Sequence, residues 1–283
     1  MTIRDWLKTA TQTLEQAVIP SASIDSTLIL AHALGQDRTY LIAHPDEPLT
    51  DSILSVANGY LVRRKKYEPM AFILGYKEFF SLKLKTDQRA LIPRGETECL
   101  VQAALDWLNK QDTPQRAAEI GTGSGAISVA LAHSAPQHEY YATDISLEAL
   151  ALAKKNAADH NVAITFLPGN LGEPLSHLAG AINLLTANLP YIPEYRLSTL
   201  DSTITYFEPN VALAGGANGL ELYHQFFPQA KELLAPGGVL LCEHDDDQGE
   251  AMRDLAHTHF PNAAITTLQD YSGHDRVLSC LAL

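Results

Sequence analysis

Four consecutive residues, Asn188-Leu189-Pro190-Tyr191, follow the apolar stretch at 182–187 and could bind a planar nitrogen group. The Asn188 side-chain oxygen and the Leu189 main-chain carbonyl could accept hydrogen bonds from both N–H groups of an amide or an exocyclic amine, which would hold the nitrogen and shift electron density toward it. Pro190 restricts the backbone before it, and the Tyr191 ring offers a face to a developing positive charge. The motif therefore predicts activation of a weakly nucleophilic nitrogen. An ordinary turn followed by a core tyrosine is the alternative.

A glycine-rich turn, Glu119-Ile120-Gly121-Thr122-Gly123-Ser124-Gly125, leaves a predicted strand and enters a predicted helix. Glycine allows the backbone to turn sharply and to pass close to a ligand. The G-x-G-x-G spacing differs from the G-x-G-x-x-G of dinucleotide sites, and the G-K-[ST] of a P-loop is absent. The turn instead resembles the first motif of class I S-adenosylmethionine methyltransferases, which predicts cofactor contacts from Glu119, Gly121, Thr122, Gly123, Ser124 and Gly125. A buried salt-bridge partner is the alternative for Glu119.

Two further loops are expected to contact a nucleoside. Asp144 ends the next predicted strand, where a carboxylate can accept hydrogen bonds from both ribose hydroxyls. The alternative for Asp144 is an N-cap of the following helix. Methyltransferases commonly use the loop after the third strand for adenine, so Asn170 is predicted to bind the adenine amino group and Leu171 its face. A plain turn would also contain Gly169-Asn170.

Strands and helices alternate after residue 91, which predicts a largely parallel sheet covered by helices on both faces. Ligands bind outside the carboxyl ends of such strands, so the glycine turn and residues 188–191 should lie near one another. The predicted strands are 116–120, 139–144, 163–167, 182–187, 238–243, 263–269 and 275–282. The predicted helices are 95–109, 124–133, 146–159, 219–234 and 247–258.

The first part of the chain has helical periodicity without strand-like alternation. Gly35 is expected to end a helix and Asp25 to help start one. Residues 70–90 read as a β-hairpin because residues 79–85 alternate with a period of two. The predicted domains are therefore a helical substrate-recognition domain at 1–68, a hairpin linker at 69–90 and a methyltransferase domain at 91–283. The basic cluster 63–66 is either a solvated helix end or a contact for a partner or ribosomal RNA.

Composition excludes several classes of function. The net charge of −13 would repel duplex nucleic acid, so direct DNA binding is not expected. The 3 cysteines and 11 histidines show no disulfide framework and no metal-binding pattern, so no metal is predicted, with ion binding at 244–247 as the weaker alternative to a charged loop. No apolar stretch reaches the ~18 residues of a membrane span. A cytoplasmic monomer that does not bind membranes is the expectation.

Motifs spread over the chain resemble the HemK/PrmC family of protein-glutamine methyltransferases. They are EPMAFILGYKEF at 68–79, IPRGETE at 92–98, the glycine turn, residues 188–191, residues 208–220 and DYSGHDR at 270–276. The resemblance implies a small N-terminal helical domain joined by a β-hairpin to a Rossmann-like class I methyltransferase domain with a mostly parallel seven-stranded sheet. It also implies that S-adenosyl-L-methionine is converted to S-adenosyl-L-homocysteine while the glutamine in the GGQ motif of class I peptide-chain release factors is methylated. Residues 188–191 and Arg94 would bind the substrate, and Asn188 would also contact the cofactor. Arg94 and Glu98 are expected at the mouth of the pocket or in salt bridges.

Three residues depart from the family pattern. Leu189 replaces the first proline of N-P-P-Y, Gly95 replaces a proline, and Asn170 stands where aspartate is frequent. The alternatives are a glutamine methyltransferase for a ribosomal protein, a cofactor-binding protein that has lost turnover, and an N6-adenine DNA methyltransferase. The last would need base flipping and a basic groove, and the acidic composition disfavours it.

Overall fold

A computed structural model of the protein describes residues 1–282, and the chain separates into two compact units. The helical unit comprises Met1–Tyr76 together with Asp201–Phe207, and the sheet unit comprises Lys77–Leu200 and Glu208–Leu283. Among the described residues, no helix combines the length and apolarity needed to cross a bilayer.

The N-terminal segment of the helical unit forms the helices α1 (Ile3–Gln16), α2 (Ala22–Leu34), α3 (Arg38–Ala43), α4 (Asp51–Lys65) and α5 (Met70–Leu74). Side-chain oxygens of Thr2, Asp37 and Thr50 accept hydrogen bonds from free N–H groups at the starts of α1, α3 and α4. Gly35 ends α2 in the left-handed conformation, with φ +66°, which confirms the predicted helix end. Trp6 and Leu30 are buried in the core of this unit.

The basic cluster 63–66 contains one buried cation. The Arg64 guanidinium lies 2.7 Å from the Asp25 carboxylate, in the first turn of α2, and both side chains are buried. Arg63 pairs with Glu68 at 2.6 Å. A solvated helix end is therefore the wrong interpretation for Arg64, which ties α4 to α2 through a paired and buried charge.

The β-hairpin is shorter than predicted, because residues 70–74 form helix α5. Strands β1 (Tyr76–Phe79) and β2 (Leu82–Lys85) make a two-stranded sheet. Phe80 and Ser81 connect them with φ of +48° and +62°, as a tight two-residue turn requires. Within the sheet unit, β2 is fixed by the Asn156 side chain, which accepts from the Lys85 N–H at 2.8 Å and donates to the Lys85 carbonyl at 3.1 Å.

The large sheet has seven strands in the order β5-β4-β3-β6-β7-β9-β8, which confirms the predicted fold class. Neighbouring strands are parallel from β5 to β7, while β9 is antiparallel to both β7 and β8. The direction of strand order changes between β3 and β6, and this is where doubly wound sheets bind ligands. The strands are β3 (Arg116–Ile120), β4 (Glu139–Asp144), β5 (Thr165–Pro168), β6 (Ile182–Ala187), β7 (Leu234–Glu243), β8 (Ala264–Gln269) and β9 (Asp275–Leu281).

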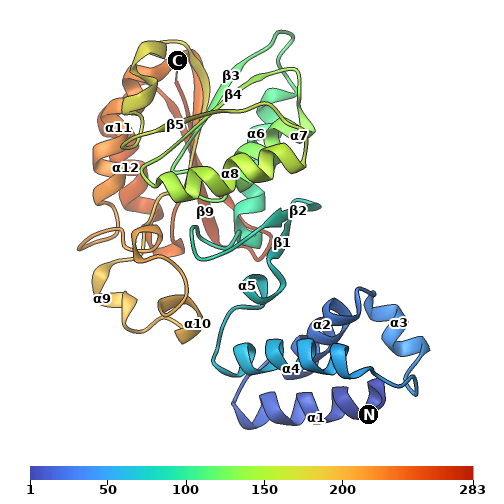
Figure 1. Ribbon diagram of the computed structural model, residues 1–283. Helices are drawn as coiled ribbons and strands as arrows, with labels where there is room; N and C mark the ends of the chain where they lie inside the picture. The colour runs from blue at the N-terminus through green and yellow to red at the C-terminus, as the bar shows by residue number, and fades with distance from the viewer. Residues whose placement is uncertain (283) are drawn as a thin grey trace. The chain divides into compact units, whose positions relative to one another are not determined.

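Helices cover both faces of this sheet (Figure 1). One face packs against α6 (Glu98–Leu108), α7 (Ala126–Ser134) and α8 (Leu147–Asp159), and the other against α11 (Glu221–Leu233) and α12 (Gly249–His259). Successive residues of β3 alternate between the two cores, with Ala117 in the first and Ala118 in the second. The alternation of small apolar side chains in β3 therefore allows helices to pack closely on both sides.

Several short helices were not predicted from the sequence: η2 (Glu173–Leu178), α9 (Glu194–Leu197), α10 (Ser202–Thr205) and η3 (Asn210–Ala212). Two more short helices, η1 (Gly95–Thr97) and η4 (Asp246–Gln248), lie at the starts of the predicted helices 95–109 and 247–258. Each has six residues or fewer, which is too short to show a helical period in the sequence.

Candidate active site

A pocket opens at the carboxyl ends of β3, β4 and β6, within the sheet unit. It encloses about 1120 Å³ of space, part of it open to solvent, which is sufficient for a nucleoside-sized ligand. The lining includes most of the predicted site residues: Arg94, Glu119, Gly121, Thr122, Gly123, Ser124, Asp144, Asn170, Leu171, Asn188, Leu189 and Pro190. The fold thus places the glycine turn and the Asn188 loop in one pocket.

The glycine turn adopts backbone conformations that favour glycine. Gly121, Gly123 and Gly125 have φ of +73°, +55° and +82°. A Cβ atom on Gly121 would lie 2.9 Å from Leu189 Cδ2, and one on Gly125 would lie 3.0 Å from Ala153 Cβ. Gly121 therefore allows the Asn188 loop to approach the turn. Gly125 is outside the pocket lining, and its contact allows α7 to pack closely on α8.

The buried Glu119 carboxylate is hydrogen-bonded to the glycine turn and to the start of α7. Its Oε2 accepts hydrogen bonds from the Thr122 hydroxyl at 2.6 Å, from the Ser128 N–H at 3.0 Å and from the Ser128 hydroxyl. These partners are neutral, so the salt-bridge alternative is wrong. Burial raises the pKa of Glu119 to about 7, and the Ser128 and Thr122 hydrogen bonds act in the opposite direction.

Asp144 lies at the end of β4 with part of its hydrogen-bonding capacity in use. Its two oxygens accept from the Gly123 N–H and the Ser146 N–H, each at 2.8 Å. The N-cap of α8 is Ser146, whose hydroxyl accepts from the Ala149 N–H, so the N-cap alternative for Asp144 is wrong. A carboxylate offers about four acceptor positions. Capacity thus remains for two ligand hydroxyls, although burial raises the pKa of this carboxyl.

The loop after β5 places Asn170 and Leu171 in the same pocket. The Asn170 side chain donates to the Glu173 carboxylate at 3.1 Å. Leu171 is buried with φ +48°, and its carbonyl accepts from the Thr143 hydroxyl at 2.7 Å. An apolar surface and a polar side chain therefore lie next to each other in this part of the pocket.

The Asn188 loop is held by side chains from three other parts of the sheet unit. Asn188 Nδ2 donates to the Thr97 hydroxyl at 3.2 Å, and the Leu189 N–H donates to the Tyr223 hydroxyl at 3.3 Å. Gln248 donates to the Tyr191 carbonyl at 2.9 Å. Leu189, in place of the family's proline, is 3% exposed and packs against the glycine turn.

Tyr191 is the one member of the predicted substrate-binding motif outside the pocket lining. Its hydroxyl donates to Glu243 Oε1 at 3.1 Å. Burial raises the pKa of this phenol far above its usual range, and the adjacent Glu243 carboxylate adds to the effect. Tyr191 is therefore a neutral hydrogen-bond donor, and its contact with a substrate stays a prediction.

The sequence interpretation missed four residues that form hydrogen bonds with the Asn188 loop: Thr97, Tyr223, Glu243 and Gln248. Thr97 belongs to the IPRGETE motif, which could have indicated it. Tyr223 and Glu243 lie in otherwise apolar core segments, and only their tertiary partners identify them. Gly219 also supports the loop, because a Cβ there would lie 2.2 Å from the Tyr191 carbonyl.

Arg94 lines the pocket and forms a salt bridge at the same time. Its partner Glu208 has a side chain only 1% exposed and also accepts from the Ile92 N–H at 3.0 Å. Glu98 does not line this pocket, and its Oε1 accepts from the Phe80 N–H at 2.9 Å in the hairpin turn. The predicted position at the pocket mouth is thus wrong for Glu98.

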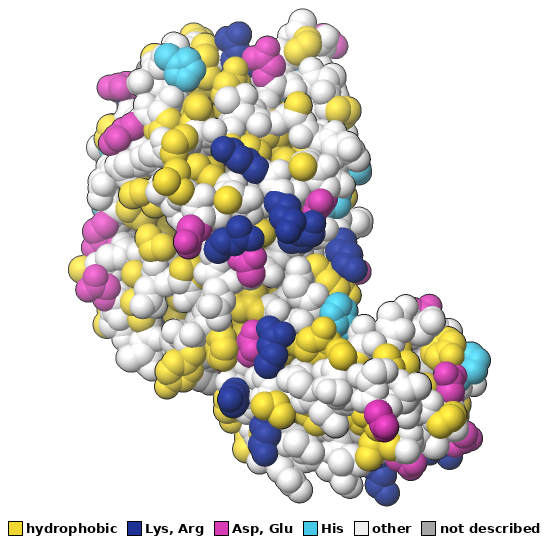
Figure 2. Space-filling view, in the orientation of Figure 1, with side chains coloured by type: hydrophobic (Ala, Val, Ile, Leu, Met, Phe, Trp, Pro, Cys, Tyr) yellow, Lys and Arg dark blue, Asp and Glu magenta, His cyan; other side chains and the backbone are white. Residues whose placement is uncertain are grey.

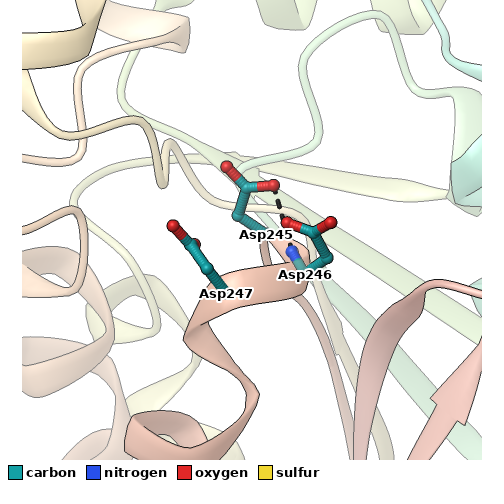
Figure 3. Close-up of side chains that lie close together, drawn as sticks. All are labelled: Asp245, Asp246 and Asp247. Atoms are coloured by element: carbon teal, nitrogen blue, oxygen red, sulfur yellow. Dashed lines mark hydrogen bonds between the residues drawn. The ribbon is translucent and has the colours of Figure 1, made fainter.

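Asp245, Asp246 and Asp247 form an acidic cluster at the end of β7 (Figure 3). Arg196 lies 2.8 Å from the Asp245 carboxylate and 3.4 Å from that of Asp247. His274 lies 3.6 Å from the Asp246 carboxylate. Basic groups of the chain itself therefore contact all three carboxylates, which favours the interpretation as a charged loop.

Known protein families match both the N-terminal helical part and the sheet-containing part of the chain. The PrmC N-terminal domain family matches residues 5–75, and the methyltransferase small domain family matches residues 97–197. The release factor glutamine methyltransferase of Vibrio cholerae is 40% identical over 286 residues, covering 98% of this chain and 96% of the relative. The protein of the same name from Geobacter sulfurreducens is 37% identical, covering 98% of this chain and 95% of the relative.

Solved structures support the fold alone. A methyltransferase from Pyrococcus furiosus superimposes with a TM-score of 0.51 at 17% identity, covering 72% of this chain and 91% of that chain. A T. thermophilus 16S rRNA methyltransferase, in complex with AdoMet and guanosine, gives a TM-score of 0.52 at 15% identity, covering 74% of this chain and 50% of that chain. The fold is therefore that of a methyltransferase. Because sequence similarity to the curated relatives extends over nearly the whole chain, the protein belongs to the release factor glutamine methyltransferase family.

Proposed function

We propose that this chain transfers a methyl group from S-adenosyl-L-methionine to the side-chain amide nitrogen of the glutamine in the GGQ motif of class I peptide-chain release factors. The observation that carries the proposal is one pocket lined by both Asp144 and Asn188. A carboxylate suited to ribose hydroxyls and a carboxamide suited to a substrate amide thus face the same space. The family to which the chain belongs supports the choice of substrate.

The residues present fit S-adenosylmethionine, which supplies an electrophilic methyl group on a sulfonium sulfur when bound. Asp144 would accept from its ribose hydroxyls, with the capacity left after the bonds from Gly123 and Ser146. Asn170 and Leu171 would bind the adenine, and the backbone of the glycine turn at 121–124 would contact the remainder. The fit rests on the donor and acceptor types in the lining.

Asn188 would supply the first acceptor for the substrate amide. Its Nδ2 is bonded to Thr97, so the oxygen is the end of the carboxamide that remains for a ligand. The Leu189 carbonyl would be the second acceptor, so that both N–H groups of the glutamine amide could donate hydrogen bonds. These bonds would shift electron density toward the amide nitrogen, whose lone pair is otherwise delocalised into the carbonyl. The nitrogen gains the methyl group and loses one proton to water or a nearby carbonyl. A strong base is unnecessary because the N-alkylated amide cation is very acidic.

Arg94 is the proposed contact at the substrate side of the pocket. It is half-buried and already paired with Glu208, so its orientation is fixed before a substrate binds. A fixed guanidinium could donate to a backbone carbonyl of the substrate peptide.

Transfer of a labelled methyl group tests the proposal. The purified chain is incubated with methyl-labelled S-adenosylmethionine and a full-length class I release factor, with a matched release factor whose GGQ glutamine is replaced by alanine. Label on the first protein and none on the second is the expected result. Equal labelling of both, or none on either, would overturn the proposal.

The same assay distinguishes the alternatives. Label on a ribosomal protein would indicate the second glutamine substrate, and cofactor binding without transfer to any translation protein would indicate a binding protein. Label on duplex DNA would indicate an adenine methyltransferase. The net charge of −13 argues against that outcome. On the face drawn in Figure 2, Asp and Glu side chains also lie beside several Lys and Arg side chains.

A further inference from the structure

Tyr223 is a fully buried tyrosine whose hydroxyl lies beside the Asn188 loop. It belongs to α11, its exposed fraction is 0%, and its ring packs edge-to-face on Phe227 with the two centroids 6.4 Å apart. The apolar core between α11 and the sheet therefore fixes the ring. A phenol in such a core needs hydrogen-bond partners, because a buried hydroxyl without them is costly.

The Tyr223 hydroxyl joins the ends of two neighbouring strands. It donates to the main-chain carbonyl of Glu243, at the end of β7, and it accepts from the Leu189 N–H at 3.3 Å, in the loop that follows β6. A main-chain carbonyl can only accept and a main-chain N–H can only donate, so the direction of both bonds is determined. Burial also raises the pKa of Tyr223 well above its usual range, which keeps the hydroxyl protonated.

The Leu189 N–H is a donor that the proline of the family pattern would lack. Leu189 is only 3% exposed, and a buried N–H without an acceptor would destabilise the fold. Leucine also lacks the ring that limits rotation about the N–Cα bond of proline. The bond to Tyr223 satisfies the additional N–H and restrains the backbone at a residue that no ring restrains.

Three contacts then determine the direction of the Leu189 carbonyl. Tyr223 holds the N–H, the side chain packs against Gly121, and Pro190 restricts the backbone of the residue before it. We propose that Tyr223 is a positioning residue that fixes the Leu189 peptide and thereby keeps its carbonyl in place as the second acceptor for the substrate amide. The inference rests on the proposed function, which assigns that role to the carbonyl. Tyr223 is outside the pocket lining and acts only through Leu189.

Removal of the hydroxyl alone tests the role of Tyr223. Tyr223→Phe keeps the ring and should lower kcat about 10-fold or more. The KM of the release factor and the Kd of S-adenosylmethionine should change less than about 3-fold, because the other contacts of both ligands remain.

Tyr140→Phe is the matched control. Tyr140 is 5% exposed, lies outside the pocket lining, and donates to the carbonyls of Leu131 and Ala135 at 3.2 and 2.7 Å. This variant also loses buried hydrogen bonds, but its kcat should stay within about 3-fold of the wild type. An equal loss of kcat in Tyr140→Phe and Tyr223→Phe would show that reduced stability explains both, and the inference would be wrong.

An ester between residues 188 and 189 tests the same hydrogen bond from its other partner. Replacement of Leu189 by its α-hydroxy acid removes the N–H and keeps both the leucine side chain and Tyr223. This change should lower kcat about as much as Tyr223→Phe, and the two changes combined should lower it less than about 3-fold further, because they remove one bond. Multiplied losses would mean that the two groups act independently, which contradicts the proposed role.

Exchange of the Leu189 N–H gives a readout that needs no activity. In the cofactor-free protein, NMR should show that its protection, relative to that of the buried Leu240 N–H in β7, falls at least about 5-fold in Tyr223→Phe and is unchanged in Tyr140→Phe. Unchanged protection in Tyr223→Phe would overturn the inference even if the wild type methylates glutamine. If the wild type did not methylate glutamine, the proposed function would be wrong, while the exchange result would still decide whether Tyr223 holds residue 189.

Discussion

The two sides of the pocket are held by different kinds of contact. On the cofactor side, hydrogen bonds of Glu119 and Asp144 reach partners 2 to 21 residues away in the sequence, and most of these partners belong to the glycine turn and the start of α7. On the amide side, the bonds of Leu189, Tyr191 and Asn188 reach partners 34 to 91 residues away. One side is therefore encoded in a short segment, and the other forms only when the whole sheet unit is folded. Substitutions on the two sides should accordingly impair different steps.

The largest expected effect is on the amide side. Asn188→Ala should lower turnover at least ~100-fold, about 2.7 kcal/mol in the barrier, because the substrate amide loses an acceptor. Cofactor affinity should change less than about 3-fold. Single-turnover rates and titration calorimetry measure the two quantities separately. Wild-type turnover in this variant would refute the role assigned to Asn188.

Glu119 should make stability depend on pH on the cofactor side. Its pKa is raised to about 7 in the folded protein, mainly by burial, and the neighbouring Asp144 acts in the same direction. The folded form thus binds the proton more tightly, so the stabilisation is full below about pH 4.5 and is lost as the pH rises through about 7. Relative to Glu119→Gln, the cofactor-free wild type should lose about 2 kcal/mol of unfolding free energy between pH 5 and 7. Urea unfolding of both proteins tests this, and parallel pH curves would contradict it.

Asp144→Ala tests whether a substitution on the cofactor side of the pocket impairs cofactor binding more than turnover. It should weaken S-adenosylmethionine binding about 10- to 30-fold, which corresponds to about 1.4–2 kcal/mol, because the ribose hydroxyls lose a charged acceptor. At saturating cofactor, turnover should fall much less than in Asn188→Ala. Calorimetry that shows no loss of affinity would make the ribose assignment wrong.

Gly121→Ala should impair both the cofactor side and the amide side of the pocket, because Gly121 of the glycine turn lies against Leu189 of the Asn188 loop. Its φ of +73° disfavours a side chain, and the new Cβ would lie 2.9 Å from Leu189 Cδ2. We expect a loss of about 1–2 kcal/mol in unfolding free energy beyond that of Gly180→Ala, whose glycine has φ +69° and no atom within 4 Å of the added Cβ. Both cofactor affinity and turnover should decline. Equal losses of stability in the two variants, from urea unfolding, would show that the contact with Leu189 is unimportant.

Much of the sheet was predictable from local pattern. The predicted strands 116–120, 139–144 and 182–187 have the bounds found for β3, β4 and β6, because buried parallel strands are short apolar runs bounded by turn residues. β7 begins at Leu234, earlier than predicted, since Leu234 pairs with Ile182 across a register shift. Helix α5 was missed because a single helical turn carries little periodicity.

The sequence alone determined the order of the strands and longer helices of the large sheet, the helix end at Gly35 and the family resemblance, because each depends on neighbouring residues or on the order of motifs along the chain. Only the tertiary structure decided that Arg64 is buried with Asp25, that Asn188 bonds to Thr97, and that Tyr191 bonds to Glu243. These partners are 39, 91 and 52 residues apart. Polar groups that are so far apart in the sequence form hydrogen bonds with each other only where packing of the folded chain has excluded the water that would otherwise bind them.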